Sequence, residues 1–335
     1  MAAADSAVAE NAVAAFYRGK TVRMRVGLAA GGGYDLYTRA IARHLGAHLP
    51  GNPTAIVENV PGAGGALLAA DIYNRGAKDG TELGIWPGAL FLQRVLGDTS
   101  LGFSMEGWGF VGAPGISEYV CESQDRSGIT DWKQLIGPNA RPTAFGAVAG
   151  SGEQQSLMIR DVFNMSNLRI VGGYAGTAPV RLAMEQGEVD GQCLNDWSSL
   201  LANSLDDLKT GRQKILLQLI TQKKQGVPQG DAPTIYEFLS DDSDKATVKV
   251  GIEDPGVYAR AFVVPPGVPA ERLAALRKAF DDTMADTDFR EDAGKANLDI
   301  SPRSGAELEQ LIQNAEQTPE AVKARLRGYF KVGGG

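Results

Sequence analysis

The stretch TVRMRVGLAAGGGYD, residues 21–35, decides the fold of this chain. Apolar and polar side chains alternate over Thr21–Leu28, which is the pattern of a half-buried β-strand. Three glycines follow at 31–33, where the backbone can turn tightly. Beyond Tyr34 the apolar side chains fall at helical spacing, at Leu36, Ala40, Ile41 and Leu45. Strand, glycine-rich turn and helix in this order open a βαβ unit.

The same unit recurs along the chain. A strand over 54–59 is followed by PGAGG (61–65) and a helix, and a strand over 142–147 leads through GSG (150–152) into another helix. Such alternation predicts sheets with parallel strands that helices cover on both faces. The stretch 222–255 is polar and is predicted to be a surface connection. Helices are predicted over 66–75, 153–163, 178–186, 270–285, 305–313 and 319–329.

Composition excludes several classes of function. The chain has 335 residues, of which 43% are hydrophobic and 22% charged, so it can form two lobes with a core in each. A formal net charge of −7 disfavours binding to nucleic acid, whose phosphates require a basic face. No apolar run is long enough to predict a membrane-spanning helix. Residues 1–6 (MAAADS) lack the basic and apolar regions of a secretory signal, so no export signal is predicted.

Three glycine-rich turns that follow strands and begin helices predict an anion site. They are Gly31–Gly33, Gly62–Gly65 and Gly150–Gly152. Ligands of open α/β sheets bind outside the carboxyl ends of the strands, where helix starts offer unpaired N–H groups and a partial positive charge. No nucleotide-binding glycine motif is complete, so a carboxylate is the expected anion. Each turn taken singly is also explained as an ordinary tight turn.

The sequence offers no catalytic or metal-binding constellation. His44 and His48 lie four residues apart on one predicted helix, but HLGAH lacks the glutamate of a zinc protease. Ser151 does not complete a nucleophile motif, and both histidines precede the plausible serines. No catalytic residue, metal or cofactor is therefore predicted. Cys121 and Cys193 are read either as one disulfide or as two buried thiols.

Taken together, several motifs resemble the substrate-binding proteins of tripartite tricarboxylate transporters, the Bug or TctC-like family. They span almost the whole chain. The motifs are FYRGK (16–20), AGGGYD (30–35), HLGAHLPGNP (44–53), NVPGAGG (59–65), KDGT (78–81), GYAGTAP (173–179), GEVD (187–190) and VPPGVP (264–269).

The resemblance implies the type II periplasmic binding protein fold, in which two α/β lobes are joined by crossing strands. Each lobe is expected to be a mostly parallel sheet flanked by helices. We assign residues 1–113 and 222–335 to lobe I and residues 114–221 to lobe II, with the ligand cleft between them. The resemblance further implies a monomer in the periplasm that delivers a small carboxylate, either a dicarboxylate or an aromatic one, to the permease subunits of such a transporter.

The resemblance and the glycine-rich turns together define the expected ligand-binding residues. Aromatic side chains at strand ends are added as pocket walls, although each is also explained as a core residue. The full set is Ala30, Gly32, Gly33, Tyr34, Asp35, Trp86, Gly150, Ser151, Gly152, Gly176, Thr177, Ala178, Asp196 and Trp197.

Two departures from the family pattern concern the ligand. Ala30 stands where many relatives have proline, and QCLND (192–196) has Leu194 near the place of a frequent acidic residue. The acidic contact is then either lost to Leu194 or displaced to Asp196. Two alternatives to a transport function stay open at this point: a carboxylate sensor that signals to a membrane partner, and an α/β enzyme.

Overall fold

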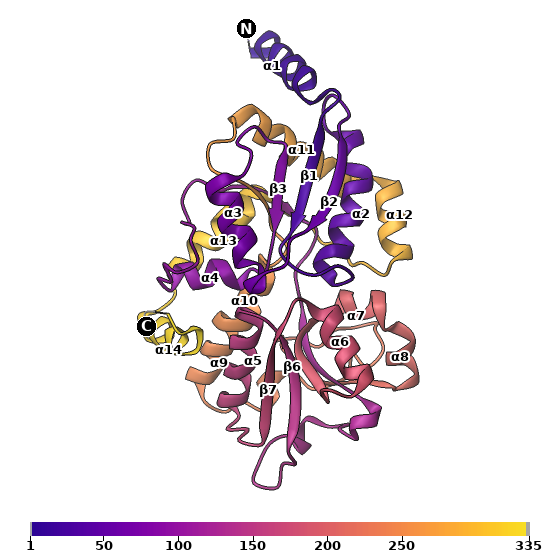
Figure 1. Ribbon diagram of the computed structural model, residues 1–335, viewed down its shortest axis with the longest axis vertical. Helices are drawn as coiled ribbons and strands as arrows, with labels where there is room; N and C mark the ends of the chain where they lie inside the picture. Colours follow the sequence, from indigo (N-terminus) through magenta and orange to yellow (C-terminus); the bar gives the residue numbers. More distant parts are fainter. Residues whose placement is uncertain (1, 333–335) are drawn as a thin grey trace.

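The computed structural model describes residues 2–332 and has two lobes, stacked along the long axis of the molecule (Figure 1). Each lobe is built on one sheet with helices around it. The expected two-lobed α/β fold is confirmed, but the expectation of mostly parallel sheets is wrong, because both sheets are mixed. None of the helices between residues 2 and 332 combines the length and the apolar character that crossing a bilayer requires.

The sheet of the first lobe has the strand order β11-β4-β10-β3-β1-β2. β1 pairs in parallel with β2 and β3, as the predicted βαβ units require, whereas β10 is antiparallel to both β3 and β4. The sheet is mixed because β10 enters it from the other lobe. Its strands are β1 (Thr21–Val26), β2 (Thr54–Asn59), β3 (Glu82–Ile85), β4 (Gly109–Ala113), β10 (Phe262–Val264) and β11 (Arg303–Ser304).

The sheet of the second lobe has the order β7-β6-β8-β5-β9. β6 is parallel to β7 and β8, and β5, which arrives from the first lobe, is antiparallel to β8 and β9. The strands are β5 (Tyr119–Gln124), β6 (Thr143–Val148), β7 (Leu168–Tyr174), β8 (Gly191–Asp196) and β9 (Gln213–Gln218).

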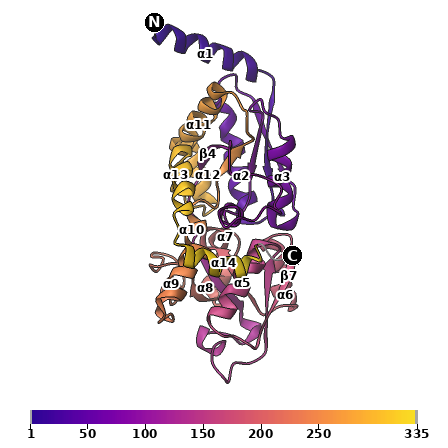
Figure 2. The ribbon, with the colours of Figure 1, turned by 90° about the vertical axis from the view of Figure 1, so that its left-hand side faces the viewer.

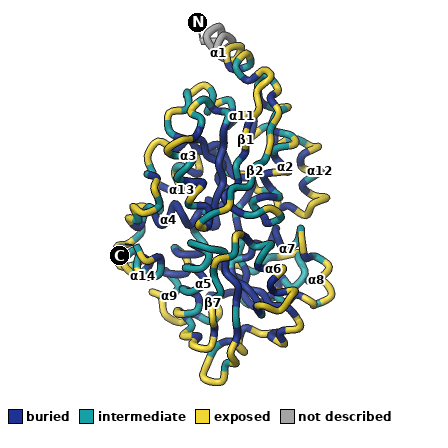
Figure 3. Tube along the Cα trace, in the orientation of Figure 1, coloured by how far each residue is buried: buried dark blue, intermediate teal, exposed yellow. Residues whose placement is uncertain are grey.

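Helices cover both faces of the first sheet. One core contains Ile41, Leu276 and Phe289, and the other contains Ile72 and Leu308, so the two faces bury different helices. Buried residues follow the strands of both lobes in Figure 3. The helices of this lobe are α1 (Ala2–Tyr17), α2 (Gly33–His48), α3 (Ala66–Arg75), α4 (Ala89–Val95), α11 (Ala270–Ala285), α12 (Thr287–Lys295) and α13 (Gly305–Glu316).

The second lobe contains more of the chain than predicted. Residues 222–335 were expected in lobe I, but Val248 and Ile252, together with Leu326 and Phe330, pack into the core of the second lobe. In the orthogonal view α14 lies beside α5 and α9 (Figure 2). The helices packed on this lobe are α5 (Ser151–Val162), α6 (Thr177–Gln186), α7 (Trp197–Asn203), α8 (Leu205–Thr210), α9 (Asp242–Val248) and α14 (Glu320–Phe330).

The chain crosses between the lobes at 114–118, at 254–261 and at 317–319. The first two segments are joined by a hydrogen bond of 2.8 Å, in which the Ser117 N–H donates to the Gly256 carbonyl oxygen. The second contains the short helix α10 (Asp254–Val257). These crossings form the hinge between the lobes.

Candidate functional site

A cavity lies between the two lobes. It sits where parallel strands of both sheets end and helices begin, which is where α/β folds bind their ligands. The lining residues are Leu28, Ala29, Gly32, Gly33, Tyr34, Pro87, Ser117, Tyr119, Val148, Ser151, Gly152, Gln155, Gly176, Thr177, Cys193, Leu194, Asn195, Asp196, Ser199 and Arg260.

Three helices from the two lobes start at this cavity. The residues that precede them, Gly32 for α2, Gly150 for α5 and Gly176 for α6, provide no side-chain cap. The N–H groups of a helix's first turn have no partner within the helix, and together they carry roughly half a positive charge. Residues from each of the three starts line the cavity. The arrangement concentrates hydrogen-bond donors and positive potential at one place.

The lobes are closed over the cavity. The Ala29 N–H donates to the Ala175 carbonyl oxygen across the cleft at 2.9 Å. Gly64 has a φ of +63°, and a Cβ at this position would overlap the Ala149 carbonyl oxygen of the second lobe. A Cβ at Gly32 would lie 3.0 Å from Thr177 Oγ1. Glycine therefore allows the two lobes to meet backbone to backbone.

Eight of the expected ligand-binding residues line the cavity, and they come from both lobes. They are Gly32, Gly33, Tyr34, Ser151, Gly152, Gly176, Thr177 and Asp196. Gly150 and Ala178 lie next to it at the lobe contact: Gly150 packs on Ala63 and Gly64, and the Ala178 Cβ lies 3.6 Å from where a Cβ of Gly31 would be.

Four expected residues lie elsewhere. Ala30 is exposed on the surface. Asp35 turns back on its own loop, accepting a hydrogen bond from the Gly31 N–H at 2.9 Å and pairing with Arg39 at 2.9 Å. Burial opposes this charge, but these partners hold the pKa of Asp35 below its usual value. One hydrogen-bond donor of the first glycine turn, the Gly31 N–H, is thus already bound by the protein itself.

The two tryptophans were assigned to the pocket wall, and that assignment is wrong. Trp86 packs against Phe91 and Trp108 in the core of the first lobe, with 1% of its surface exposed. Trp197 is equally buried, and its Nε1–H donates to Gln218 Oε1 at 3.2 Å. Each side chain is therefore part of the core of its own lobe.

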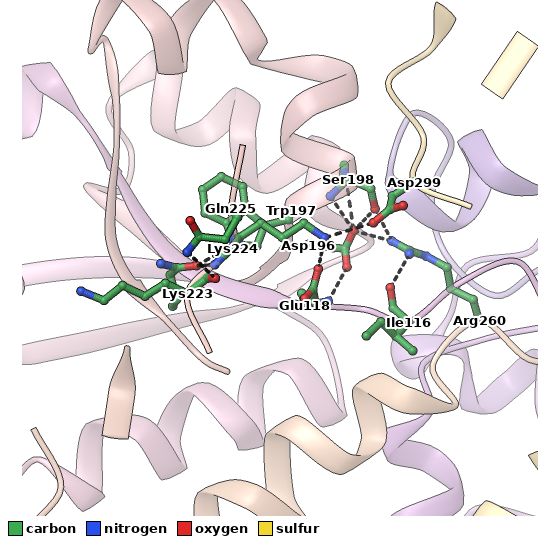
Figure 4. A network of polar contacts seen from close by, with 12 residues as sticks. Ile116, Glu118, Asp196, Trp197, Ser198, Lys223, Lys224, Gln225, Arg260 and Asp299 are labelled. Atoms are coloured by element: carbon green, nitrogen blue, oxygen red, sulfur yellow. Dashed lines mark hydrogen bonds and ion pairs between the residues drawn. The ribbon is translucent and has the colours of Figure 1, made fainter. Parts of the chain in front are cut away.

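Arg260 is the main cavity residue that the sequence does not predict. It is 1% exposed and pairs with Asp196, while its Nη2 also donates to Ser198 Oγ at 3.0 Å (Figure 4). Nη1 donates to the Ile116 carbonyl oxygen at 3.0 Å. Its guanidinium carbon lies 4.1 Å from the centre of the Tyr37 ring. One side chain therefore connects the first lobe, the second lobe and the hinge.

Asp196 is held by several donors besides Arg260. Its side chain accepts hydrogen bonds from the Ser198 N–H at 2.9 Å, at the start of α7, and from the Glu118 N–H at 3.0 Å. Farther from the cavity, Lys224 pairs with Glu118 and, at 3.0 Å, with Asp299 (Figure 4). The Arg260–Asp196 ion pair, which lines the cavity, is thus linked through Glu118 to Lys224 and Asp299.

A disulfide joins Cys121 of β5 to Cys193 of β8, which resolves the two alternatives for these cysteines. The register of β5 shifts at Cys121 against both neighbouring strands. Next to the disulfide, Leu194 has a φ of +65°, a value that a branched residue rarely adopts. Cys193 and Leu194 both line the cavity, so this irregular strand end forms part of its wall.

Glu122 lies fully buried behind this wall. Its carboxyl group accepts hydrogen bonds from Gln192 at 2.6 Å, Gln213 at 2.7 Å and Asn195 at 2.8 Å. Desolvation outweighs these donors and raises the pKa of Glu122 to about 7. Asn195 itself lines the cavity, so the buried carboxyl group helps to orient one of its polar side chains.

The histidines lie outside the site. His44 and His48 of α2 contact Asp292 and Asp286, each at 3.1 Å, on the surface where α2 meets α12. Among the residues that the structure describes, no group of three or more His, Cys, Asp or Glu side chains is arranged to hold a metal ion.

Solved structures with the same architecture cover nearly the whole chain. MatC from Rhodopseudomonas palustris, solved with bound malate, matches with a TM-score of 0.70 at 19% identity, over 91% of this chain and 99% of its own. The periplasmic binding protein BugD matches with a TM-score of 0.71 at 19% identity, over 94% and 99%. This chain has the fold of a periplasmic binding protein.

A third such structure, an R. palustris protein solved with adipate, matches with a TM-score of 0.68 at 16% identity, over 93% of this chain and 98% of its own. No protein-family model matches the sequence, and no curated protein matches it significantly. At identities below 25% the likeness concerns the fold. Within a periplasmic binding protein fold, the cavity described above lies between the lobes, beside the hinge.

Proposed function

We propose that this chain is a periplasmic solute-binding protein that captures a small carboxylate, either a dicarboxylate or an aromatic carboxylate. It would hand the ligand to the permease subunits of a tripartite tricarboxylate-type transporter in the membrane. The observation that carries the proposal is the convergence of three uncapped helix starts, from both lobes, on one cavity. A carboxylate there accepts hydrogen bonds from backbone N–H groups and from Ser151 and Thr177, and such charge-assisted bonds contribute about 1.5–3 kcal/mol each.

Two further observations support the proposal. MatC and the R. palustris protein of similar fold were solved with malate and adipate, which are both dicarboxylates. A disulfide, such as the one between Cys121 and Cys193, persists in an oxidising compartment like the periplasm.

The chemistry of the cavity favours binding over catalysis. Among the described residues that line it, the ionisable side chains are Tyr34, Tyr119, Asp196 and Arg260. Asp196 and Arg260 are paired with one another, and burial raises the pKa of both tyrosines, so they keep their protons. Neither tyrosine is therefore set to exchange a proton near neutral pH.

A thermal-unfolding screen with mono-, di- and tricarboxylates and aromatic acids tests the proposal. A ligand at a hundred times its dissociation constant is expected to add about 2.7 kcal/mol of stability. Gly32→Val should abolish this stabilisation, since its side chain would fill the space beside Thr177. Gly328→Val, at an exposed position of α14 with open space around it, is the matched control and should leave it intact. Stabilisation by no acid, or an equal response of both variants, would refute the proposed site.

A further inference from the structure

At the hinge side of the cavity, two hydroxyl groups make no hydrogen bond of ordinary geometry within residues 2–332. They belong to Ser117, in the first crossing segment, and to Tyr34, in the first turn of α2, and both atoms are buried. Ser117 as a whole is 5% exposed, and both residues line the cavity. A buried hydroxyl without a partner costs free energy, so such groups mark a place where a ligand can supply the missing hydrogen bond.

A third hydroxyl group belongs to the same wall. Tyr119, at the start of β5, lines the cavity, and the pKa of its phenol is affected by loose hydrogen-bond contacts with the hydroxyls of Ser117 and Tyr34. Tyr119 is the direct neighbour of Asp196 across β5 and β8. The hydroxyl wall formed by Tyr34, Ser117 and Tyr119 therefore lies beside the Arg260–Asp196 ion pair.

The charge beside the hydroxyl wall is balanced. Arg260 is the one cationic side chain among the described residues that line the cavity, and it is paired with Asp196, which lines the cavity as well. Arg260 is 1% exposed and Asp196 is 7% exposed, so water screens neither of them effectively. A second anionic group at this end would meet no uncompensated positive charge.

The pKa values of Tyr34 and Tyr119 show how this end of the cavity treats negative charge. Desolvation, reinforced by the charge of Asp196 and opposed by Arg260, raises the pKa of Tyr119 to about 12. Burial also raises the pKa of Tyr34 well above its ordinary value. Negative charge is thus disfavoured at these oxygens, and a carboxylate placed against them would face the same desolvation. A neutral hydroxyl or carbonyl group would not.

We propose that the cavity selects a monocarboxylate whose far end carries a neutral hydrogen-bonding group, a hydroxyl or a carbonyl, over a dicarboxylate. This inference rests on the proposed function: it keeps a small carboxylate as the ligand and departs from the dicarboxylate alternative. The helix starts hold the one carboxylate, and Ser117 and Tyr34 bind the neutral group. The cavity lining also includes the apolar side chains of Leu28, Val148 and Leu194, which would contact the body of the ligand.

Two matched pairs of acids test the selection by isothermal titration calorimetry at pH 7.5. The members of a pair differ at the far end: 4-hydroxybenzoate against terephthalate, and 6-hydroxyhexanoate against adipate. In whichever pair binds, the hydroxy acid is expected to bind at least tenfold more tightly. A dicarboxylate that binds equally well or better would overturn the inference and leave the proposed function standing. If no carboxylate stabilised the protein, both the proposed function and this inference would be refuted.

Variants locate the selection in the named residues. Asp196→Asn keeps a side-chain oxygen for the Ser198 N–H but removes the negative charge, which leaves Arg260 free to attract a second carboxylate. The preference should then move toward the dicarboxylate by at least tenfold, and an unchanged preference would contradict the role of the ion pair.

Ser117→Ala tests the same selection independently, and it can be used even if Asp196→Asn does not fold. It should weaken binding of 4-hydroxybenzoate about five- to tenfold and leave binding of benzoate unchanged, because benzoate has no far hydroxyl group. Ser240→Ala, at an exposed position before α9, is the matched control. Equal losses for both ligands in Ser117→Ala would show that Ser117 does not contact the far end.

Discussion

Arg260 illustrates how much of this molecule depends on single side chains at the hinge. Its partners, Ile116, Asp196, Ser198 and Tyr37, come from both lobes and are far apart in the sequence. The glycine turns could be predicted because a turn is a local property of the chain. Arg260 could not, since nothing within a few residues of it distinguishes it from an exposed arginine.

Removing the Arg260 guanidinium should destabilise the protein strongly. Arg260→Met leaves Asp196 buried without its counter-ion, and loss of one partner of a buried pair typically costs about 3–5 kcal/mol. Arg75→Met removes an arginine from an exposed pair with Asp71 and should cost less than about 1 kcal/mol. Urea unfolding of both variants measures the difference. Equal losses would mean that the buried pair contributes no more than a surface one.

Glu122 should make stability depend on pH. Its native pKa of about 7 lies above its ordinary value of 4.5, so the native state binds this proton more tightly than the unfolded state. Stability from this group is therefore complete below about pH 4.5, falls as the pH rises toward 7, and is level above that. The total change is on the order of 3 kcal/mol.

Glu122→Gln tests this prediction by urea unfolding between pH 5 and 8. Gln213 has an unpartnered Oε1, so its amide can turn to accept a hydrogen bond from the new side chain. The variant should lose the decline with pH that the parent protein shows, while Glu188→Gln, at an exposed position, should keep it. Other groups that titrate in this range are present in all three proteins. Parallel curves of unfolding free energy against pH would therefore show that Glu122 does not cause the decline.

At the scale of elements, long periodic segments were predicted well. The helices over 66–75 and 270–285 have the predicted bounds, because each is long enough to bury a recurring apolar face. The stretch 222–255, by contrast, was predicted to be a surface connection and contains α9. That helix is capped by Asp241 and buries Thr247 and Val248 at its end, so it has no apolar stripe to recognise.

The disulfide between β5 and β8 should contribute measurably to stability. It closes a loop with a sequence separation of 72, for which the loss of chain entropy in the unfolded state predicts about 4 kcal/mol. Urea unfolding with and without a reducing agent measures the contribution. In the Cys121→Ser, Cys193→Ser double variant the reducing agent should have no effect. A parent protein that also ignored the agent would indicate that the bridge does not stabilise the fold.

At the scale of the whole molecule, the two-lobed architecture was predictable and the exact allocation of the chain was not. The repeated strand–turn–helix units, together with the family resemblance, predict two lobes. The apolar face of α14, with Leu326 and Phe330, indicates burial without indicating which lobe it packs on. For the site, the backbone turns were predicted, whereas the hydroxyl wall depends on how the hinge brings β5 beside α2.

Closure of the lobes should depend on Gly64. Gly64→Ala would put a Cβ onto the Ala149 carbonyl oxygen and hold the lobes apart, so the affinity for a carboxylate should fall at least tenfold. Gly19→Ala has a similar φ of +73° but open space around it, so it bears the backbone strain without the steric overlap. Small-angle X-ray scattering should show a larger radius of gyration for Gly64→Ala alone. If Gly64→Ala and Gly19→Ala had the same radius of gyration and the same affinity for a carboxylate, this role of Gly64 would be contradicted.

The odd number of crossings between the lobes has a practical consequence. Because residues 2–332 pass the hinge three times, the chain begins on the first lobe and ends with α14 on the second (Figure 1). A chain with two crossings would return both ends to the same lobe. Fluorophores attached near Ala2 and Val332 would sit on different lobes, so a ligand that closes the lobes should change the energy transfer between them.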